Sequence, residues 1–217
     1  MPDNGVMSKG ITIIGGGGHA KVVLDAMRGV GMFIRGFVDD QSPCPLSGML
    51  DHLGSIDTVE EDDRVILAIG DVVARRRVLG RLGAVRVAGP VIHTGAIVSP
   101  SASVGEGAFV GPGAIVNAEA RVGAHAIVNT GAIVEHDCRV GMNTHIAPGS
   151  VLGGGVEVGE DALVGLGARV LPGIVIGDGC VVGAGAVVTR DVPSESTVVG
   201  VPGRVMAIGN PPEADLR

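Results

Sequence analysis

The sequence predicts two unlike domains, a small Rossmann-like parallel α/β domain followed by a parallel β-helix. Two observations carry this prediction. A branched aliphatic residue occupies every sixth position from Ile92 to Val188, seventeen times in succession. Before that array, over residues 10–89, short strand-like runs alternate with helical segments, the pattern of a parallel α/β domain.

The period of six fits neither an α-helix nor a single strand, so it reflects a larger repeating unit. A small residue precedes nearly every aliphatic by two positions, as at Ala108 and Cys138, with Val156 and Ile174 as larger exceptions, and a glycine often follows the aliphatic, as at Gly123. We expect the aliphatic to fill the interior, the small residue to fit a corner and the glycine to allow a turn with positive φ. Three hexads would form one coil, and the seventeen hexads would give between five and six coils.

The individual elements follow from local composition. We expect residues 1–9 to be a disordered tail, residues 10–89 to be the α/β domain, residues 90–190 to be the solenoid and residues 191–217 to be a C-terminal tail. Within the first domain, strands are expected at Ile11–Ile14, Phe33–Val38, Val65–Ile69 and Val85–Val87, and helices at Lys21 to about Val30 and Val72 to about Leu82.

Composition narrows the class of protein. Aromatic residues make up 1% of the chain and the net charge is −7, which argues against a nucleic-acid-binding surface. No apolar run approaches the roughly 18 residues that would span a membrane. The three cysteines have neither metal spacing nor an even count, and they predict reduced thiols in a cytoplasmic protein.

A glycine-rich loop, Gly15-Gly16-Gly17-Gly18-His19-Ala20, follows the first strand and opens the first helix. Backbone N–H groups at such a helix N-terminus bind anionic groups, most plausibly a phosphate. Three readings stay open: a tight strand–helix turn, a nicotinamide dinucleotide site with Asp39 at the ribose, and a nucleotide or nucleotide-sugar site. The domain has about half the length of a full dinucleotide-binding fold, which favours a nucleotide or nucleotide-sugar site.

A second group of candidate site residues surrounds His136, which lies two residues after an inward valine and next to Asp137. A histidine beside a carboxylate suits a general base. A solvent-exposed turn histidine is the alternative, and a metal site that includes His145 is a third possibility.

Taken together, the motifs resemble one family. The glycine-rich loop, Val38-Asp39-Asp40, Ala68-Ile69-Gly70, Ile92-His93, the run from Asn129 to Asp137 and the closing Gly200-Val201-Pro202-Gly203-Arg204 cover nearly the whole chain. The chain resembles the sialic-acid O-acetyltransferase type of hexapeptide-repeat acyltransferases, in particular the bacterial nucleotide-4-amino-sugar N-acetyltransferases. The resemblance implies a left-handed β-helix, a homotrimer, and acetyl-CoA bound in grooves between adjacent solenoids.

The resemblance also implies residue roles. His136 would take a proton from the acceptor amine, supported by Asp137, where many relatives carry Glu. The acetyl-CoA site would include His145, Gly154, Leu166 and Ala184, and the nucleotide-sugar site would include Gly17, Gly18, His19, Asp39 and Asp40. Because lysine is nearly absent, Arg169, Arg190 and Arg204 are the candidates for binding CoA phosphates.

The predicted function is therefore acetyl-CoA-dependent N-acetylation of a nucleotide-linked 4-amino-4,6-dideoxy sugar by direct attack. Such a reaction needs proton removal and oxyanion stabilisation, and it needs no metal. O-acetylation of sialic acid or another hydroxyl acceptor is the alternative. Solenoids of this repeat also serve as structural or zinc-hydrolase scaffolds, which is a third reading.

Overall fold

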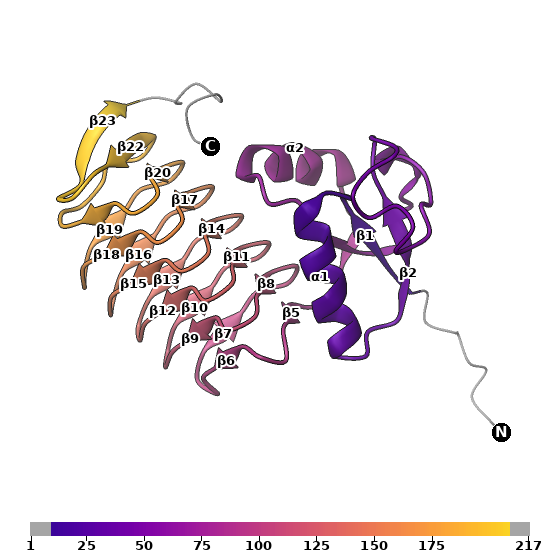
Figure 1. The fold of residues 1–217 in the computed structure, drawn as a ribbon, viewed down its shortest axis with the longest axis horizontal. Helices are drawn as coiled ribbons and strands as arrows, with labels where there is room; N and C mark the ends of the chain where they lie inside the picture. The colour runs from indigo at the N-terminus through magenta and orange to yellow at the C-terminus, as the bar shows by residue number, and fades with distance from the viewer. Residues whose placement is uncertain (1–9, 209–217) are drawn as a thin grey trace.

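The computed structural model describes residues 10–208; the tails expected at 1–9 and beyond 208 lie outside the described residues. The small α/β domain lies at one end of an elongated solenoid, and the chain enters the solenoid at β5 and climbs it coil by coil (Figure 1). The predicted combination of the two folds is confirmed.

The small domain contains a four-stranded parallel sheet with strand order β2-β1-β3-β4. Helix α2 has the predicted bounds, whereas α1 begins three residues before the expected Lys21, because the helix starts inside the glycine run. The elements are β1 (Ile11–Ile14), α1 (Gly18–Gly29), β2 (Ile34–Val38), the 3-10 helix η1 (Ile56–Thr58), β3 (Arg64–Leu67), α2 (Val72–Leu82) and β4 (Arg86–Val87).

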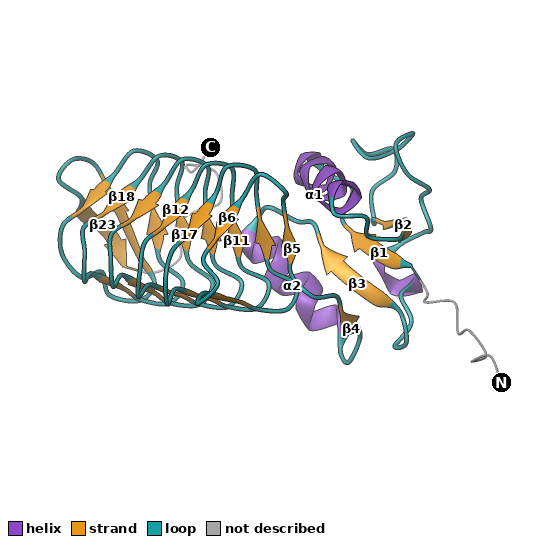
Figure 2. Cartoon of the chain, turned by 90° about the horizontal axis from the view of Figure 1, so that it is seen from below, coloured by secondary structure: helices purple, strands orange, loops and turns teal. Residues whose placement is uncertain are grey.

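The two helices pack on opposite sides of this sheet (Figure 2). Helix α1 buries Leu24 and Met27 in one cluster with Ile13 of the sheet. Helix α2 contributes Val78 to a second cluster with Val65. Successive residues of a strand point to opposite faces, so the fully buried strand β1 supplies both clusters.

The solenoid consists of two-residue strands stacked into three parallel sheets, which we call faces 1, 2 and 3. Face 1 contains β5 (Val91–Ile92), β8 (Phe109–Val110), β11 (Ile127–Val128), β14 (His145–Ile146), β17 (Leu163–Val164) and β20 (Val181–Val182). Face 2 contains β6 (Ile97–Val98), β9 (Ile115–Val116), β12 (Ile133–Val134), β15 (Val151–Leu152), β18 (Arg169–Val170) and β21 (Val187–Val188). Face 3 contains β7 (Ser103–Val104), β10 (Arg121–Val122), β13 (Arg139–Val140), β16 (Glu157–Val158) and β19 (Val175–Ile176).

Strand pairing fixes the coil length. Val122 pairs with Val140 on face 3, and Ile127 pairs with His145 on face 1, so each coil contains three hexads. The second residue of each strand points inward, and Val128, Val134 and the small residues between strands form one continuous core. The register predicted from the sequence is therefore correct.

The expected role of the glycines that follow the aliphatic residues is wrong. Gly105 and Gly123 do not have positive φ; the positive φ falls two residues later, for example at Gly107. These glycines are needed for close approach of successive coils instead, because a Cβ on Gly123 would lie 2.7 Å from the backbone nitrogen of Met142.

The turn position with positive φ is usually glycine, and its exceptions are informative. Among the described residues of the solenoid, the exceptions are Glu119, His125, Asp137, Asn143, Asp161 and Glu195, with φ between 57° and 61°. A side chain at this position costs about 1 kcal/mol of backbone strain. His125, Asn143 and Asp161 lie at the corner between faces 3 and 1, where the small domain docks, and Asp137 adjoins His136.

The two domains share an extensive contact. Helix α1 packs on the outer side of face 1, where Phe109 and Ile127 join its cluster. Helix α2 lies along the corner between faces 3 and 1. Its Arg76 binds Asp161 through Nε at 2.8 Å, and Asn143 donates to the Val72 carbonyl at 3.1 Å. The small domain therefore contacts the solenoid through both of its α-helices.

The segment after β21 differs from the expected tail. Residues up to 208 contain two further strands, β22 (Ser196–Val199) and β23 (Arg204–Ile208). Strand β22 continues face 1 by pairing in parallel with β20, and β23 pairs with β22 in the antiparallel direction. The hexad spacing ends at Val188, so a pattern based on six residues gave no signal for this closing hairpin.

Candidate active site

His136 and Asp137 occupy the turn between β12 and β13, at the corner between faces 2 and 3. Asp137 has a φ of 61°, which places its side chain beside the preceding residue. The His136 Nδ1 lies 2.7 Å from Asp137 Oδ2, and both side chains are exposed, at 62% and 65%. Because a carboxylate oxygen accepts, Nδ1 carries the proton and the neutral ring keeps Nε2 free as a base.

Electrostatics at this turn favour a basic imidazole. The hydrogen bond to Asp137 raises the pKa of His136 above its usual 6.5, and the nearby charge of Glu135 acts in the same direction. Glu135 is itself held by Asn117, whose Nδ2 donates to its carboxylate at 2.9 Å.

Gly154 lies one coil beyond His136 at the same corner. A Cβ on Gly154 would lie 2.6 Å from both Cε1 and Nε2 of His136, so the ring packs on bare backbone. The neighbouring Gly155 N–H donates to the His136 carbonyl at 2.8 Å, which fixes the two turns relative to each other. Among the described residues we find no acceptor for the Gly154 N–H.

The glycine-rich loop divides into two halves. Cβ atoms on Gly15 and Gly16 would collide with the domain core, at Ile69 and at Phe37, at 2.9 Å in both cases. Gly17 and Gly18 have open space around the Cβ position and are exposed at the N-terminus of α1. A tight turn therefore explains the first two glycines but not the last two, which suit close approach of a ligand.

Asp39 and Asp40 are engaged within the domain itself. Asp39 accepts hydrogen bonds from the Gly16 N–H at 2.6 Å and the Gln41 N–H at 2.7 Å, so it shapes the glycine loop. Asp40 pairs with Arg81 at 2.6 Å and accepts from the Ile56 N–H at 3.0 Å. The bond from Arg81 lowers the pKa of Asp40.

His19 and His145 meet where the two domains join. Their ring centroids are 6.5 Å apart, and His19 packs edge-on against Phe109 at 5.3 Å. Burial, aided by the charge of Arg75, lowers the pKa of each histidine to about 4. The His19 Nε2 is buried and has no hydrogen-bond partner among residues 10–208, which leaves it available to a ligand.

The remaining predicted acetyl-CoA residues lie at a different corner from His136. Leu166 and Ala184 occupy successive turns between faces 1 and 2, and Leu166 is 59% exposed. The single chain thus brings together His136, Asp137 and Gly154 as one group and Leu166 and Ala184 as another, on either side of face 2. His145, on face 1, joins neither group.

The three arginines predicted to bind the CoA phosphates also lie in different parts of the solenoid. Arg190 follows β21 and precedes Val192, which pairs with face 3, so it lies at the His136 corner. Arg190 and Arg204 line one pocket of about 170 Å³ at the end of the solenoid. Arg169 lies on face 2, apart from this pocket.

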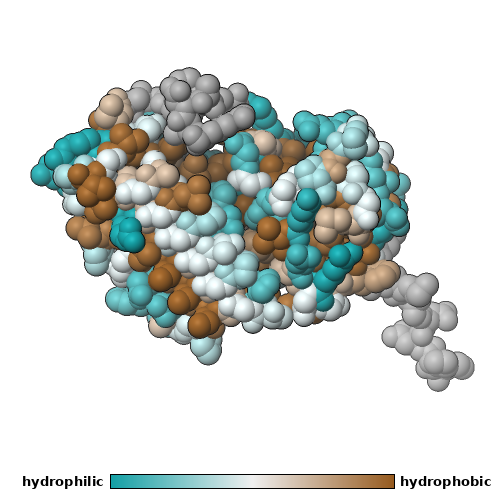
Figure 3. Space-filling view, in the orientation of Figure 1, coloured by the Kyte–Doolittle hydropathy of each residue, from teal (hydrophilic) through white to brown (hydrophobic). Residues whose placement is uncertain are grey.

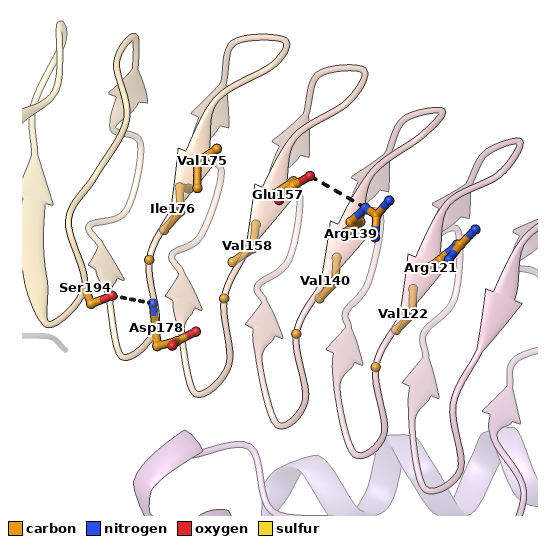
Figure 4. Close-up of a pocket in the computed structure, with 14 residues that line it drawn as sticks. Arg121, Val122, Arg139, Val140, Glu157, Val158, Val175, Ile176, Asp178 and Ser194 are labelled. Atoms are coloured by element: carbon orange, nitrogen blue, oxygen red, sulfur yellow. Dashed lines mark hydrogen bonds and ion pairs between the residues drawn. The ribbon is translucent and has the colours of Figure 1, made fainter.

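A larger groove, of about 390 Å³, lies along face 3 (Figure 4). Its outward side chains include Arg121, Arg139 and Glu157, and it contains none of the predicted site residues. No three His, Cys, Asp or Glu side chains of residues 10–208 are grouped to hold a metal ion, and no described helix is long and apolar enough to cross a membrane.

Sequence reasoning missed three residues that the structure brings to these groups. Arg75 is almost fully buried between the domains, Asn129 bonds to His145, and Glu135 adjoins His136. Asn129 and Glu135 lie in the run from Asn129 to Asp137 that carries the family resemblance, but the sequence pattern gives neither residue a role. Arg75 lies in a run of three arginines, which gives no sign of which one is buried.

Comparison with known proteins finds family matches for both domains. Residues 10–82 match the PglD N-terminal domain, and residues 119–154 and 155–190 match the bacterial transferase hexapeptide repeat. Perosamine N-acetyltransferase from Caulobacter crescentus, solved as a mutant with CoA and GDP-perosamine, is 40% identical over 92% of this chain and 98% of that one, with a TM-score of 0.82. No match was found among curated proteins.

Two further solved structures are similar to this chain over most of its length. The acetyltransferase domain of PglB from Neisseria gonorrhoeae, solved with acetyl coenzyme A, is 33% identical over 90% of this chain and 98% of that one, with a TM-score of 0.83. WeeI from Acinetobacter baumannii is 28% identical over 92% of this chain and 100% of that one, with a TM-score of 0.78.

The fold and the site thus define an acetyltransferase of the hexapeptide-repeat class. Within that class, the chain belongs to the sialic-acid O-acetyltransferase-type family, in the group of the nucleotide-4-amino-sugar N-acetyltransferases.

Proposed function

We propose that the protein transfers an acetyl group from acetyl-CoA to the amine of a nucleotide-linked 4-amino-4,6-dideoxy sugar. The observation that carries this proposal is the His136–Asp137 pair at 2.7 Å with Gly154 packed against the ring. This arrangement offers a base and a backbone donor side by side. The perosamine N-acetyltransferase, solved with its CoA and GDP-perosamine, supports the choice of both substrates.

In this mechanism His136 Nε2 removes a proton from the acceptor amine as the amine attacks the thioester carbonyl. Asp137 accepts from Nδ1 and stabilises the imidazolium that forms. The Gly154 N–H is proposed to donate to the oxyanion of the tetrahedral intermediate. The intermediate then collapses with departure of the CoA thiolate, which takes up a proton, and no covalent enzyme intermediate is required.

The acetyl donor is proposed to lie along the corner between faces 2 and 3. His136, Gly154, Pro172 and Arg190 occupy successive turns there. Coils stack about 4.8 Å apart, so Arg190 lies roughly 14 Å along the corner from His136. That separation suits a pantetheine arm, with the phosphates of CoA near Arg190 and Arg204 in their shared pocket.

The nucleotide sugar is proposed to bind at the open half of the glycine loop. Gly17, Gly18 and the unpartnered Nε2 of His19 are the groups that would contact it. Asp39 and Asp40 would act by shaping this loop, since their carboxylates already accept backbone hydrogen bonds.

We also propose that the working form is a homotrimer in the cytoplasm. The outward residues of face 2 form an apolar ladder of Ile97, Ile115, Ile133 and Val151, with Ile97 64% exposed. A row of hydrophobic surface follows strands β6, β9 and β12 (Figure 3). Packing of this face against other copies would bring the His136 corner of one chain to the Leu166 corner of the next.

The test is mass-spectrometric detection of acetyl transfer from acetyl-CoA. The acceptors are UDP-, GDP- and dTDP-linked 4-amino-4,6-dideoxy sugars beside free sialic acid. One nucleotide sugar gaining one acetyl group is the expected result. Product on sialic acid alone would move the function to O-acetylation and would leave the open glycines without a ligand.

A further inference from the structure

Arg75 is a buried cation without a carboxylate partner. Its side chain lies between the two domains and is 1% exposed. Its Nη1 donates to the Ile69 carbonyl at 2.7 Å and to the Gly70 carbonyl at 3.2 Å, and its Nη2 donates to the Asn143 carbonyl at 2.7 Å. Among residues 10–208 it forms no ion pair. Burial lowers the pKa of Arg75 to about 10, so it remains charged at neutral pH.

The Gly70 carbonyl has a second donor, His145. The Nδ1 of His145 lies 2.9 Å from this oxygen, which can only accept, so Nδ1 carries a proton. One carbonyl thus binds a guanidinium of the small domain and an imidazole of face 1.

The other nitrogen of His145 is constrained as well. Its Nε2 lies 3.0 Å from Nδ2 of Asn129. The Oδ1 of Asn129 accepts from the Thr130 N–H at 2.8 Å, so the amide nitrogen is the group that faces His145. Nε2 must therefore accept, and the contacts are satisfied only by a neutral ring protonated at Nδ1.

The surrounding charges agree with this state. His19 faces the ring, and Arg75 and Asp71 are the charged groups that act on it. The positive charge of Arg75 disfavours a second proton on His145, while Asp71 acts in the opposite direction. The hydrogen bonds thus converge on the Gly70 carbonyl: Arg75 and His145 both donate to it, and Asn129 donates to His145.

We propose that Arg75 is a positioning residue: by holding the Gly70 carbonyl against face 1, it fixes His145 as the neutral Nδ1–H tautomer and orients the turn at Asn129–Thr130. The relevance to catalysis rests on the proposed function, together with the place in the acetyl-CoA site that the family resemblance implies for His145. The tautomer itself is a property of the resting protein and does not depend on the substrate.

The rival explanation is that Arg75 only joins the two domains. Arg76 provides a matched control, because it is the next residue on α2 and also bridges the domains through Asp161, yet it makes no contact with Gly70. If Arg75 acts only as a link, the two arginine variants should affect His145 alike.

The experiment is long-range ¹H–¹⁵N NMR of the histidine side chains in the full-length protein, with His145 assigned from a His145→Gln variant. In the wild type we expect a single Nδ1–H tautomer that stays neutral between about pH 5 and 8. Arg75→Met should give mixed tautomers and should raise the pKa of His145 by on the order of one unit. Arg76→Met should leave the tautomer unchanged.

Either of two results would overturn the proposal: an Nε2–H or protonated His145 in the wild type at pH 7, or an unchanged tautomer in Arg75→Met. If Arg75→Met does not fold, Arg75→Lys keeps the charge but cannot reach all three carbonyls, and it should also lose the single tautomer. The wild-type spectrum tests the assignment without any variant. A failure to find acetyl transfer to a nucleotide sugar would leave these spectra as expected and would refute only the proposed function.

Discussion

The Nε2 edge of the His136 ring lies against the backbone of Gly154, one coil further along the solenoid. The contact is close enough that a Cβ on Gly154 would lie 2.6 Å from the ring. Stacking of coils therefore sets the position of the candidate base, since the two residues occupy equivalent turns.

His136→Asn should reduce kcat/KM by about 10²- to 10⁴-fold while the fold is retained, because the proposed general base is lost. Circular dichroism and the melting temperature should match those of the wild type, since the side chain is exposed. His93→Asn, in the turn after β5, is the control and should keep its activity. Near-full turnover of His136→Asn would remove this residue from the mechanism.

The pH profile should report the His136–Asp137 bond. The neutral imidazole is the active form, so kcat/KM should rise with pH, with a midpoint above 6.5 because Asp137 raises the pKa. Asp137→Asn should move this midpoint to lower pH and lower the plateau. Asp178→Asn, in the turn after β19, removes a carboxylate that accepts from the Glu160 N–H and should leave the midpoint unchanged. An unshifted midpoint in Asp137→Asn would show that the carboxylate does not tune the base.

Gly154→Ala should lower kcat by on the order of 10²-fold, because its new Cβ displaces the His136 ring and the adjacent N–H. Gly80→Ala, on the surface of α2 where a Cβ has open space, is the control for adding a methyl group. Equal activity of the two variants would mean that the packing of His136 on Gly154 is irrelevant to turnover.

Ile133→Asp should break the proposed trimer, because it places a charge in the middle of the apolar ladder of face 2. Light scattering coupled to gel filtration should show monomers, and activity should fall if each site needs two chains. Arg121→Asp, on face 3, changes charge without touching the ladder. A wild-type protein that is itself monomeric would refute the trimer directly.

Gly123→Ala should destabilise the protein by about 1–3 kcal/mol, because its Cβ would meet the backbone of Met142 in the next coil. Gly80→Ala should instead stabilise by about 0.5–1 kcal/mol, as expected for a helical glycine. Urea unfolding of both variants measures the difference. A neutral Gly123→Ala would mean that the coils can separate slightly without cost.

The sequence predicted the solenoid well because its signal is repetitive and local. A two-residue strand recurs every six residues, so the spacing of Val128 and Val134 reveals the inward side without any knowledge of contacts. The bounds of α2 were equally clear. The role of Gly123 was misjudged because a close approach between coils depends on Met142, nineteen positions away, which the local sequence does not show.

The candidate site was predicted less completely. The pair His136–Asp137 could be found because its members are adjacent, and positive φ at Asp137 brings them into contact. Arg75 could not be found, because its carbonyl partners come from two distant segments, the loop after β3 and the turn at Asn143. A usable signal did exist in the exceptions to the turn glycine, since Asn143 and Asp161 mark the docking corner.

The antiparallel strand β23 has a consequence for self-association. A parallel solenoid that ended at β20 and β22 would expose a row of backbone donors and acceptors to which the next copy could add its own coil. Strand β23 runs against β22 and occupies that edge of face 1. Backbone pairing of another copy onto face 1 is thus blocked at this end of the solenoid, which disfavours end-to-end fibre growth along this face.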